Sequence, residues 1–184
     1  MPPDDPLYIR YHDEEWGVPV RDGTALFALL CLEGQQAGLS WRTVLHRRDA
    51  YLELFHGFDP VHVARLTEAD VDRLSADVRL IRHRGKIQAI VRNAGALLAL
   101  EAAGAPFATH IWSFLGDETL LGDGHTPHPA GMAAARSMSR DLGRRGFAFV
   151  GPTICYAFMQ AAGLVMDHDA GCDRRSALLP GSPS

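Results

Sequence analysis

The chain has 184 residues, of which 47% are hydrophobic, so we expect one domain over residues 1–184, with a core that two lobes can share. No apolar run approaches the ~18 residues of a membrane span, and the first residues lack the basic and apolar regions of a signal peptide, which predicts a cytoplasmic protein. The formal net charge of -4 argues against nucleic-acid binding by overall charge, but not against binding through one basic face.

The N-terminal segment carries aromatic residues without a helical stripe. Tyr8, Tyr11 and Trp16 flank the run His12-Asp13-Glu14-Glu15. Aromatic side chains outside a periodic core are candidates for a stacking pocket, because their π faces attract planar, electron-poor ligands. The alternative, aromatic residues that pin an extended N-terminal arm to the core, is at least as common.

The next segment predicts a helix from its N-cap, Asp22, to Ala37, with a carboxylate, Glu33, on the same face as three leucines. An ionised carboxylate buried without a partner is costly, so such a group is usually paired, neutralised or kept for a ligand. The glutamines, glycines and Trp41 that follow make a poor core segment and favour the rim of a polar pocket. The alternative is a frayed helix end with Glu33 in solvent.

Helix signals continue along the middle of the chain, and no convincing alternation typical of strands occurs, so the predicted fold class is all-α. A long loop is expected over residues 116–131, which contain four glycines and two prolines. The predicted helices run from Trp41 to His56, after the Asp59-Pro60 cap, after a Thr67 capping box with Asp70, from Lys86 to Ala102 and from Phe107 to Leu115.

A C-terminal helical pair, near residues 132–163, encloses a glycine-containing turn. The first helix ends around Arg144 and the second runs through Ala162. Glycine lets the turn approach a surface closely, and the free amides at the start of the second helix can receive a phosphate oxygen. This pattern indicates a helix-hairpin-helix. The alternative is an ordinary corner between two helices.

Charged residues are segregated along the chain. Residues 78–100 carry five basic side chains and no acid, and Arg136 to Arg145 contain four arginines and one aspartate. Acidic residues gather in the stretches 4–15 and 59–77. We therefore expect one basic side, although solvated faces are the usual explanation of charge runs.

Histidine and cysteine residues suggest a metal site. His168 and Cys172 are separated by three residues, which suits zinc but is weak in isolation, and His12 can add a third ligand only if the chain ends meet. Cys31 and Cys155 lie in apolar runs, which predicts reduced core thiols rather than a disulfide framework.

Longer motifs extend from about residue 5 to 172. They are Asp5-Pro6-Leu7-Tyr8, Tyr11-His12-Asp13, Glu15 to Pro19, Cys31 to Trp41, Ile81 to Ile87 and Gly146 to His168. Together they resemble the 3-methyladenine DNA glycosylase I family, a branch of the helix-hairpin-helix glycosylases. The resemblance implies a helical bundle in two lobes with the base pocket between them.

Members of that family flip an alkylated adenine out of duplex DNA and cut its N-glycosidic bond. The resemblance makes Glu33 the catalytic residue that bonds the base. The same match surrounds the base with Tyr8, Tyr11, Trp16 and Trp41. The alternative is a helix-hairpin-helix module that binds DNA without catalysis.

The resemblance also assigns DNA contacts. Gly38 and Leu39 match the wedge that fills the gap left by the flipped nucleotide, and Gly151, Thr153 and Lys86 would contact the DNA backbone. Lys86 is the only lysine and lies at a helix start that suits either a phosphate or the turn. Since a strand-nicking lyase step needs an amine nucleophile, we predict a monofunctional enzyme. The resemblance implies that it excises N3-methyladenine, with N3-methylguanine as a further candidate, from double-stranded alkylated DNA, and we expect a monomer.

The resemblance implies a structural zinc, held in the family by two cysteines and two histidines. His12, His168 and Cys172 match three of these ligands. The chain begins Met1-Pro2-Pro3 and lacks both the first cysteine and the tryptophan that follows it in the family. Three alternatives stay open: weak zinc binding, a water as the fourth ligand, or no metal.

Overall fold

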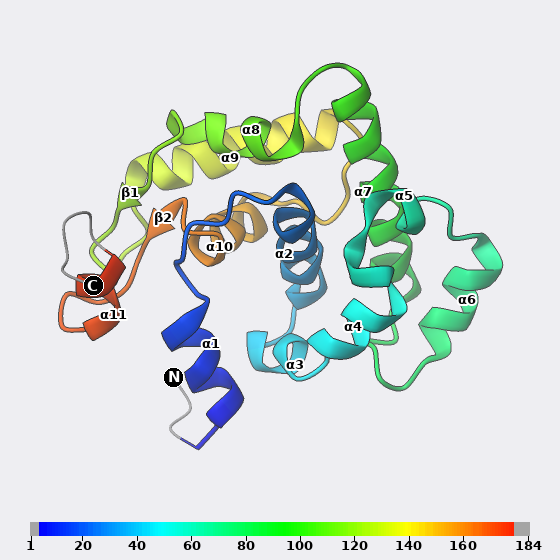
Figure 1. The fold of residues 1–184 in the computed structure, drawn as a ribbon, viewed down its shortest axis with the longest axis horizontal. Helices are drawn as coiled ribbons and strands as arrows, with labels where there is room; N and C mark the ends of the chain where they lie inside the picture. Colours follow the sequence, from blue (N-terminus) through cyan, green and yellow to red (C-terminus); the bar gives the residue numbers. More distant parts are fainter. Residues whose placement is uncertain (1–3, 179–184) are drawn as a thin grey trace.

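The protein, described for residues 4–178 by a computed structural model, is built almost entirely of helices (Figure 1). The predicted all-α class is confirmed. Within that range the strands are limited to one parallel pair, β1 (Leu120–Leu121) and β2 (Val165–Met166), with Leu120 opposite Val165. Positions 1–3, where the family cysteine is missing from the sequence, and the tail from 179 to 184 lie outside the described residues.

The helices follow one another with short connections. In chain order they are α1 (Pro6–Glu14), α2 (Gly23–Gln36), α3 (Trp41–Leu45), α4 (Arg48–Leu54), η1 (His56–Phe58), α5 (Pro60–Val63), α6 (Glu68–Ala76), α7 (Arg84–Ala102), α8 (Phe107–Trp112), η2 (Ser113–Leu115), α9 (Pro129–Arg144), α10 (Pro152–Ala161) and α11 (Asp173–Leu178).

Helix α2 is the central element. It packs against α7 and η1 on one side and against α10 and α8 on the other. Figure 1 shows α4 to α7 grouped to one side of α2, with α8, α9 and the β pair to the other. Leu26, Phe27 and Leu30 of α2 are fully buried between these groups. The C-terminal end of α2 is therefore fixed relative to both halves of the molecule.

The predicted helix starts are confirmed where they depend on local caps. Asp22 accepts a hydrogen bond from the Ala25 amide at 2.8 Å, and Asp59 accepts the amides that follow Pro60. Thr67 and Asp70 form both bonds of the capping box. Such caps join residues three positions apart, so sequence alone places them well.

The helix predicted from Trp41 to His56 is broken in two. Helix α3 ends at Leu45 and α4 begins at Arg48. The side chain of His46, at the break, contacts the Asp5 carboxylate at 2.8 Å. A contact between residues distant in sequence therefore accompanies the break, and no glycine or proline marks it in the chain.

Helix α1 was not predicted from the aromatic segment. Asp5 caps it by accepting the Tyr8 amide at 3.2 Å, with Pro6 in the first turn. This is the same signal that marks Asp59 and Pro60, but the poor apolar stripe concealed it. Helix α11 and the β pair were also missed, and the latter joins residues more than 40 positions apart.

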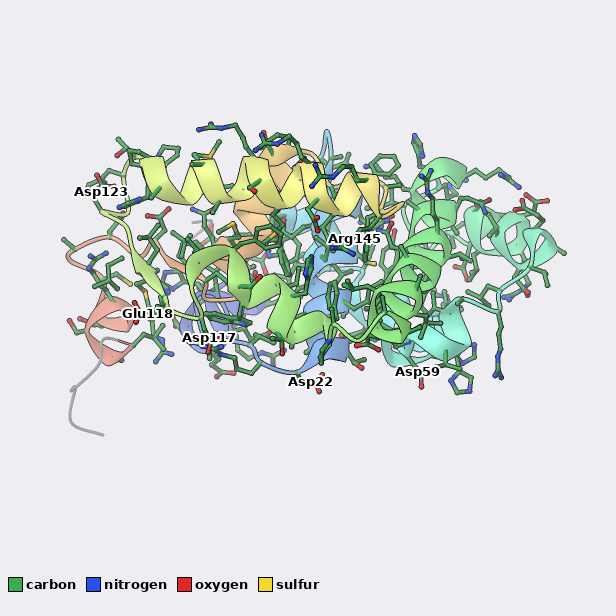
Figure 2. The ribbon with its side chains drawn as sticks, turned by 90° about the horizontal axis from the view of Figure 1, so that it is seen from above. Asp22, Asp59, Asp117, Glu118, Asp123 and Arg145 are labelled. Carbon is green, nitrogen blue, oxygen red and sulfur yellow. The ribbon has the colours of Figure 1, made fainter. Side chains whose placement is uncertain are left out.

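The arginines of the predicted basic stretch are exposed, but part of their charge is paired. Arg84 forms ion pairs with Glu68 and Asp72, so part of the predicted basic stretch is neutralised by the neighbouring acidic one. Figure 2 shows Arg145 at one end of α9 and Asp123 near the other, with Asp22, Asp59, Asp117 and Glu118 on the opposite side of the view.

Cysteine and membrane predictions have clear outcomes. The three cysteines are free, and Cys31 and Cys155 are buried, as predicted for core thiols. Among the helices of residues 4–178, none combines the length and apolar content needed to cross a bilayer.

Candidate active site

A cavity of about 300 Å³ opens between α1, α2, α3 and α10. In Figure 1 the other three, α1, α3 and α10, lie around α2. All five residues predicted to form a base pocket line the cavity: Tyr8, Tyr11, Trp16, Glu33 and Trp41. The lining also includes His12, Gln36, Ala157 and Gln160, which the sequence analysis did not assign to the pocket.

Glu33 is the central polar group of the cavity. Its side chain is only 3% exposed, so the alternative in which it lies in solvent at a frayed helix end does not hold. Its Oε2 atom is buried and has no hydrogen-bond partner among the described residues. Burial raises the pKa of this carboxyl to about 8. The pocket therefore holds an acid that a nearby cation would ionise.

Aromatic rings form the walls beside this acid. The rings of Tyr11 and Trp41 lie 5.2 Å apart, and Tyr8 meets Tyr11 edge-on at 6.4 Å. Burial, with a smaller contribution from Glu33, raises the pKa of the Tyr11 hydroxyl. The indole nitrogen of Trp41 is buried without a partner within residues 4–178. The pocket is thus walled by π faces, and two of its lining residues, Glu33 and Trp41, carry polar atoms without a partner in the described part of the chain.

Ion pairs hold α1 against the next helices. The Asp5 carboxylate is buried and contacts the Arg42 Nε atom at 2.7 Å and the His46 ring at 2.8 Å. After α1, Glu15 accepts two hydrogen bonds from the Arg48 guanidinium, one at 2.9 Å. These pairs fix the helix that carries the tyrosines, and none of them was predicted because each joins distant parts of the chain.

The three predicted metal ligands lie together. The Cys172 Sγ atom is 3.7 Å from His12 Nε2 and 3.6 Å from His168 Nδ1. The other ring nitrogens are engaged, since His12 Nδ1 contacts the Asp13 carboxylate at 2.8 Å and His168 Nε2 contacts the Trp16 carbonyl at 3.0 Å. Metal-bound histidines have this arrangement, in which an outer partner orients the ring.

No fourth histidine, cysteine or acid joins this group in the described part of the chain. The cluster nevertheless adjoins the cavity, because His12 belongs to both and the Trp16 ring lies 4.6 Å from that of His168.

The predicted wedge residues lie in the turn between α2 and α3. Gly38 has φ of 75°, a value that favours glycine, and Leu39 is 42% exposed. An exposed leucine on a tight turn beside the pocket has the form expected of an inserting side chain.

Lys86 lies underneath this turn, not on the surface. Its side chain is only 5% exposed, and its Nζ atom donates to the carbonyls of Gln35 and Ala37 at 2.7 Å each. The ammonium therefore caps the carbonyls at the C-terminal end of α2. Of the two uses suggested by its position, a phosphate or the turn, the structure shows the turn. A DNA phosphate would have to compete with both carbonyls.

The hairpin between α9 and α10 is tied to the rest of the protein. The Asn93 side chain of α7 bonds both the amide and the carbonyl of Ala148, at 2.7 and 3.1 Å. Gly151, the N-cap of α10, and Thr153 are exposed, and no side chain from residues 4–178 caps the first amides of this helix. The free amides are thus held in place and accessible to a phosphate.

Comparisons with known proteins agree on one family. A family model described as methyladenine glycosylase matches residues 2–176. The chain is 55% identical to DNA-3-methyladenine glycosylase 1 of Escherichia coli (strain K12), over 91% of each chain. It is 48% identical to DNA-3-methyladenine glycosylase of Haemophilus influenzae, over 90% of this chain and 91% of that one.

Solved structures show the same likeness. A crystal structure of 3-methyladenine DNA glycosylase I has a TM-score of 0.87 and 50% identity, covering 92% of this chain and 94% of that one. A structure from Staphylococcus aureus, described as showing the structural basis of 3-methyladenine recognition, has a TM-score of 0.86 and 38% identity, covering 94% and 93%.

Proposed function

The chain belongs to the methyladenine glycosylase family, and we propose that it removes 3-methyladenine from alkylated DNA by hydrolysing the N-glycosidic bond. The observation that carries this proposal is the buried, unpartnered carboxyl of Glu33 in an aromatic cavity. The alternative of a binding module without catalysis would leave that acid without a use.

Glu33 would select the damaged base by its charge. In DNA, N3-methyladenine carries a positive charge, and a cation beside the carboxyl lowers its pKa and favours the carboxylate. Neutral adenine provides no such compensation for a buried charge. Because the leaving base is already cationic, it needs no strong acid to depart, and the pocket contributes mainly recognition and orientation.

The DNA would be held in duplex form with one nucleotide flipped out. Leu39, on its Gly38 turn, would occupy the gap in the stack. Gly151 and Thr153 would hold the backbone through the free amides of α10. Lys86 contributes indirectly in this arrangement, by closing the end of α2 from which the wedge turn leaves.

The enzyme would be monofunctional. A lyase step needs an amine nucleophile, and the only lysine of the chain, Lys86, has its Nζ atom bonded to two carbonyls. We propose a monomer that acts in the cytoplasm on double-stranded DNA.

Methylated duplex DNA tests this function directly. Incubation with the purified protein should release free 3-methyladenine, detected by chromatography, and leave abasic sites without strand breaks at neutral pH. Absence of base release would overturn the proposed activity. Strand cleavage that Lys86→Ala removes would overturn the monofunctional assignment alone.

We propose that His12, His168 and Cys172 hold a structural zinc, with water as the fourth ligand. Their free ligand atoms lie within 4.8 Å of one another while outer partners hold both imidazole rings. Zinc would tie α1 to the segment after β2 and so support the pocket wall at Trp16. Metal analysis of purified protein should find about one zinc per chain, reduced in Cys172→Ser. Near-zero zinc in the unaltered protein would reject the proposal.

A further inference from the structure

Gln160 is a pocket residue whose amide group has a fixed direction. It lies on α10 and lines the same cavity as Glu33. Its Nε2 atom donates to Oδ2 of Asp167 at 2.7 Å, and its Oε1 atom has no partner among the described residues. One of the two N–H groups of this amide is therefore used, and its oxygen remains available to a ligand.

Asp167 is buried and tightly held. The Tyr156 hydroxyl donates to the same Oδ2 atom at 2.9 Å, and the Gly124 amide donates to Oδ1 at 3.3 Å. Tyr156 in turn accepts the amide of His128, at the start of α9, at 2.9 Å. A carboxylate accepts hydrogen bonds but cannot donate them. Turning the Gln160 amide over would place two oxygens against each other, so Asp167 locks its orientation.

We propose that Gln160 is a specificity-determining residue whose carbonyl oxygen accepts a hydrogen bond from the exocyclic amine of the bound base, and that Asp167 is its positioning residue. This inference rests on the proposed function. Glu33 would recognise the charge of the methylated purine, whereas Gln160 would recognise the amine at position 6. A purine with an oxygen at that position, such as 3-methylguanine, would place this oxygen against the Gln160 carbonyl oxygen. Both are acceptors, so this purine would bind less well.

Binding of free bases to the full chain tests the proposal. The probes are 3-methyladenine and 3-methylpurine, which lacks the amine, and the signal is the fluorescence of Trp16 and Trp41 in the pocket. The wild type should prefer 3-methyladenine. Gln160→Leu, which removes the oxygen and keeps a similar volume, should reduce that preference about threefold to tenfold, the effect of one hydrogen bond.

Asp167→Asn provides the positioning test. Its amide can donate to Oε1 of Gln160 and so lets the glutamine turn over, which should also lower the preference for the amine. Tyr156→Phe is the control, because it removes the tyrosine bond to Asp167 and leaves the Gln160 bond intact. It should reduce thermal stability and keep the preference.

Each outcome has a separate meaning. An unchanged ratio of the two affinities in Gln160→Leu, or in Gln160→Met should the first variant not fold, overturns the specificity role. An unchanged ratio in Asp167→Asn overturns the positioning role, and an equal loss in Tyr156→Phe overturns both by showing general loosening of α10. Failure of the wild type to bind either base would instead count against the proposed function.

Discussion

Glu33 and Lys86 are two buried ionisable residues at the same end of α2, and they differ in what surrounds them. Glu33 is 3% exposed and its Oε2 atom has no partner within residues 4–178. Lys86 is 5% exposed and bonds two backbone carbonyls. Burial favours the neutral form of each group, so it raises the pKa of the Glu33 carboxyl and lowers the pKa of the Lys86 amine. Burial alone therefore does not distinguish a binding group from a structural one, but the missing partner does.

The helix end has a closed side and an open side. On the closed side, the Gln35 side chain donates to the Lys86 carbonyl at 3.0 Å and accepts from the Tyr51 hydroxyl at 3.0 Å. On the open side, Glu33 meets a cavity walled by aromatic rings. Satisfied polar networks rigidify a structure, so the closed side holds in place the acid that the open side presents.

The largest expected effect comes from the open side. Glu33→Gln keeps the shape of the side chain and removes the charge available to a cationic base. We expect kcat/KM on DNA containing 3-methyladenine to fall about tenfold to a hundredfold, the range for losing one charged hydrogen bond. Chromatography of released base measures it. The variant should fold and keep its affinity for DNA, and an unchanged kcat/KM would remove Glu33 from recognition.

The closed side should respond in stability instead. Lys86→Met leaves the carbonyls of Gln35 and Ala37 without their donor, and we expect a loss of about 2 kcal/mol in the free energy of unfolding, measured in urea. Arg82→Met, an exposed change in the same basic run, serves as the control and should stay within about 0.5 kcal/mol.

The same pair of variants separates the two uses of Lys86. A phosphate contact contributes about one unit to the slope of log affinity against log salt concentration. Because the ammonium is bonded inside the protein, we expect that slope to be unchanged in Lys86→Met. A slope reduced by about one unit would support the contact between Lys86 and the DNA backbone that the sequence predicted.

Sequence predicted different parts of this arrangement for different reasons. The caps at Asp22 and Thr67 depend on near neighbours, so the sequence predicted these helix starts. A carboxylate in an apolar stripe is unusual in a helical pattern, so the sequence also predicted the position of Glu33. Gln160 and Asp167 gave no such signal. Their bond matters because α10 and the segment after β2 meet at the pocket, which only the folded chain shows.

The smallest expected effect is a pH dependence of stability that belongs to the open side alone. The Glu33 carboxyl has an ordinary pKa of 4.5 and a pKa of about 8 in the folded protein. Between these values the folded state binds more protons than the unfolded state, so the contribution of Glu33 to stability falls as pH rises through this window and is constant above it.

Glu33→Gln removes that titration. The free energy of unfolding of the variant, minus that of the wild type, should therefore increase between pH 5 and pH 9. Each pKa unit corresponds to about 1.4 kcal/mol, and water entering the open cavity reduces the full value, so we expect an increase of about 1 kcal/mol. Urea unfolding of the protein without DNA measures this at each pH. Parallel stability curves for the two proteins would mean that the acid is solvated and ionised throughout, and the contrast with Lys86 would lose its electrostatic basis.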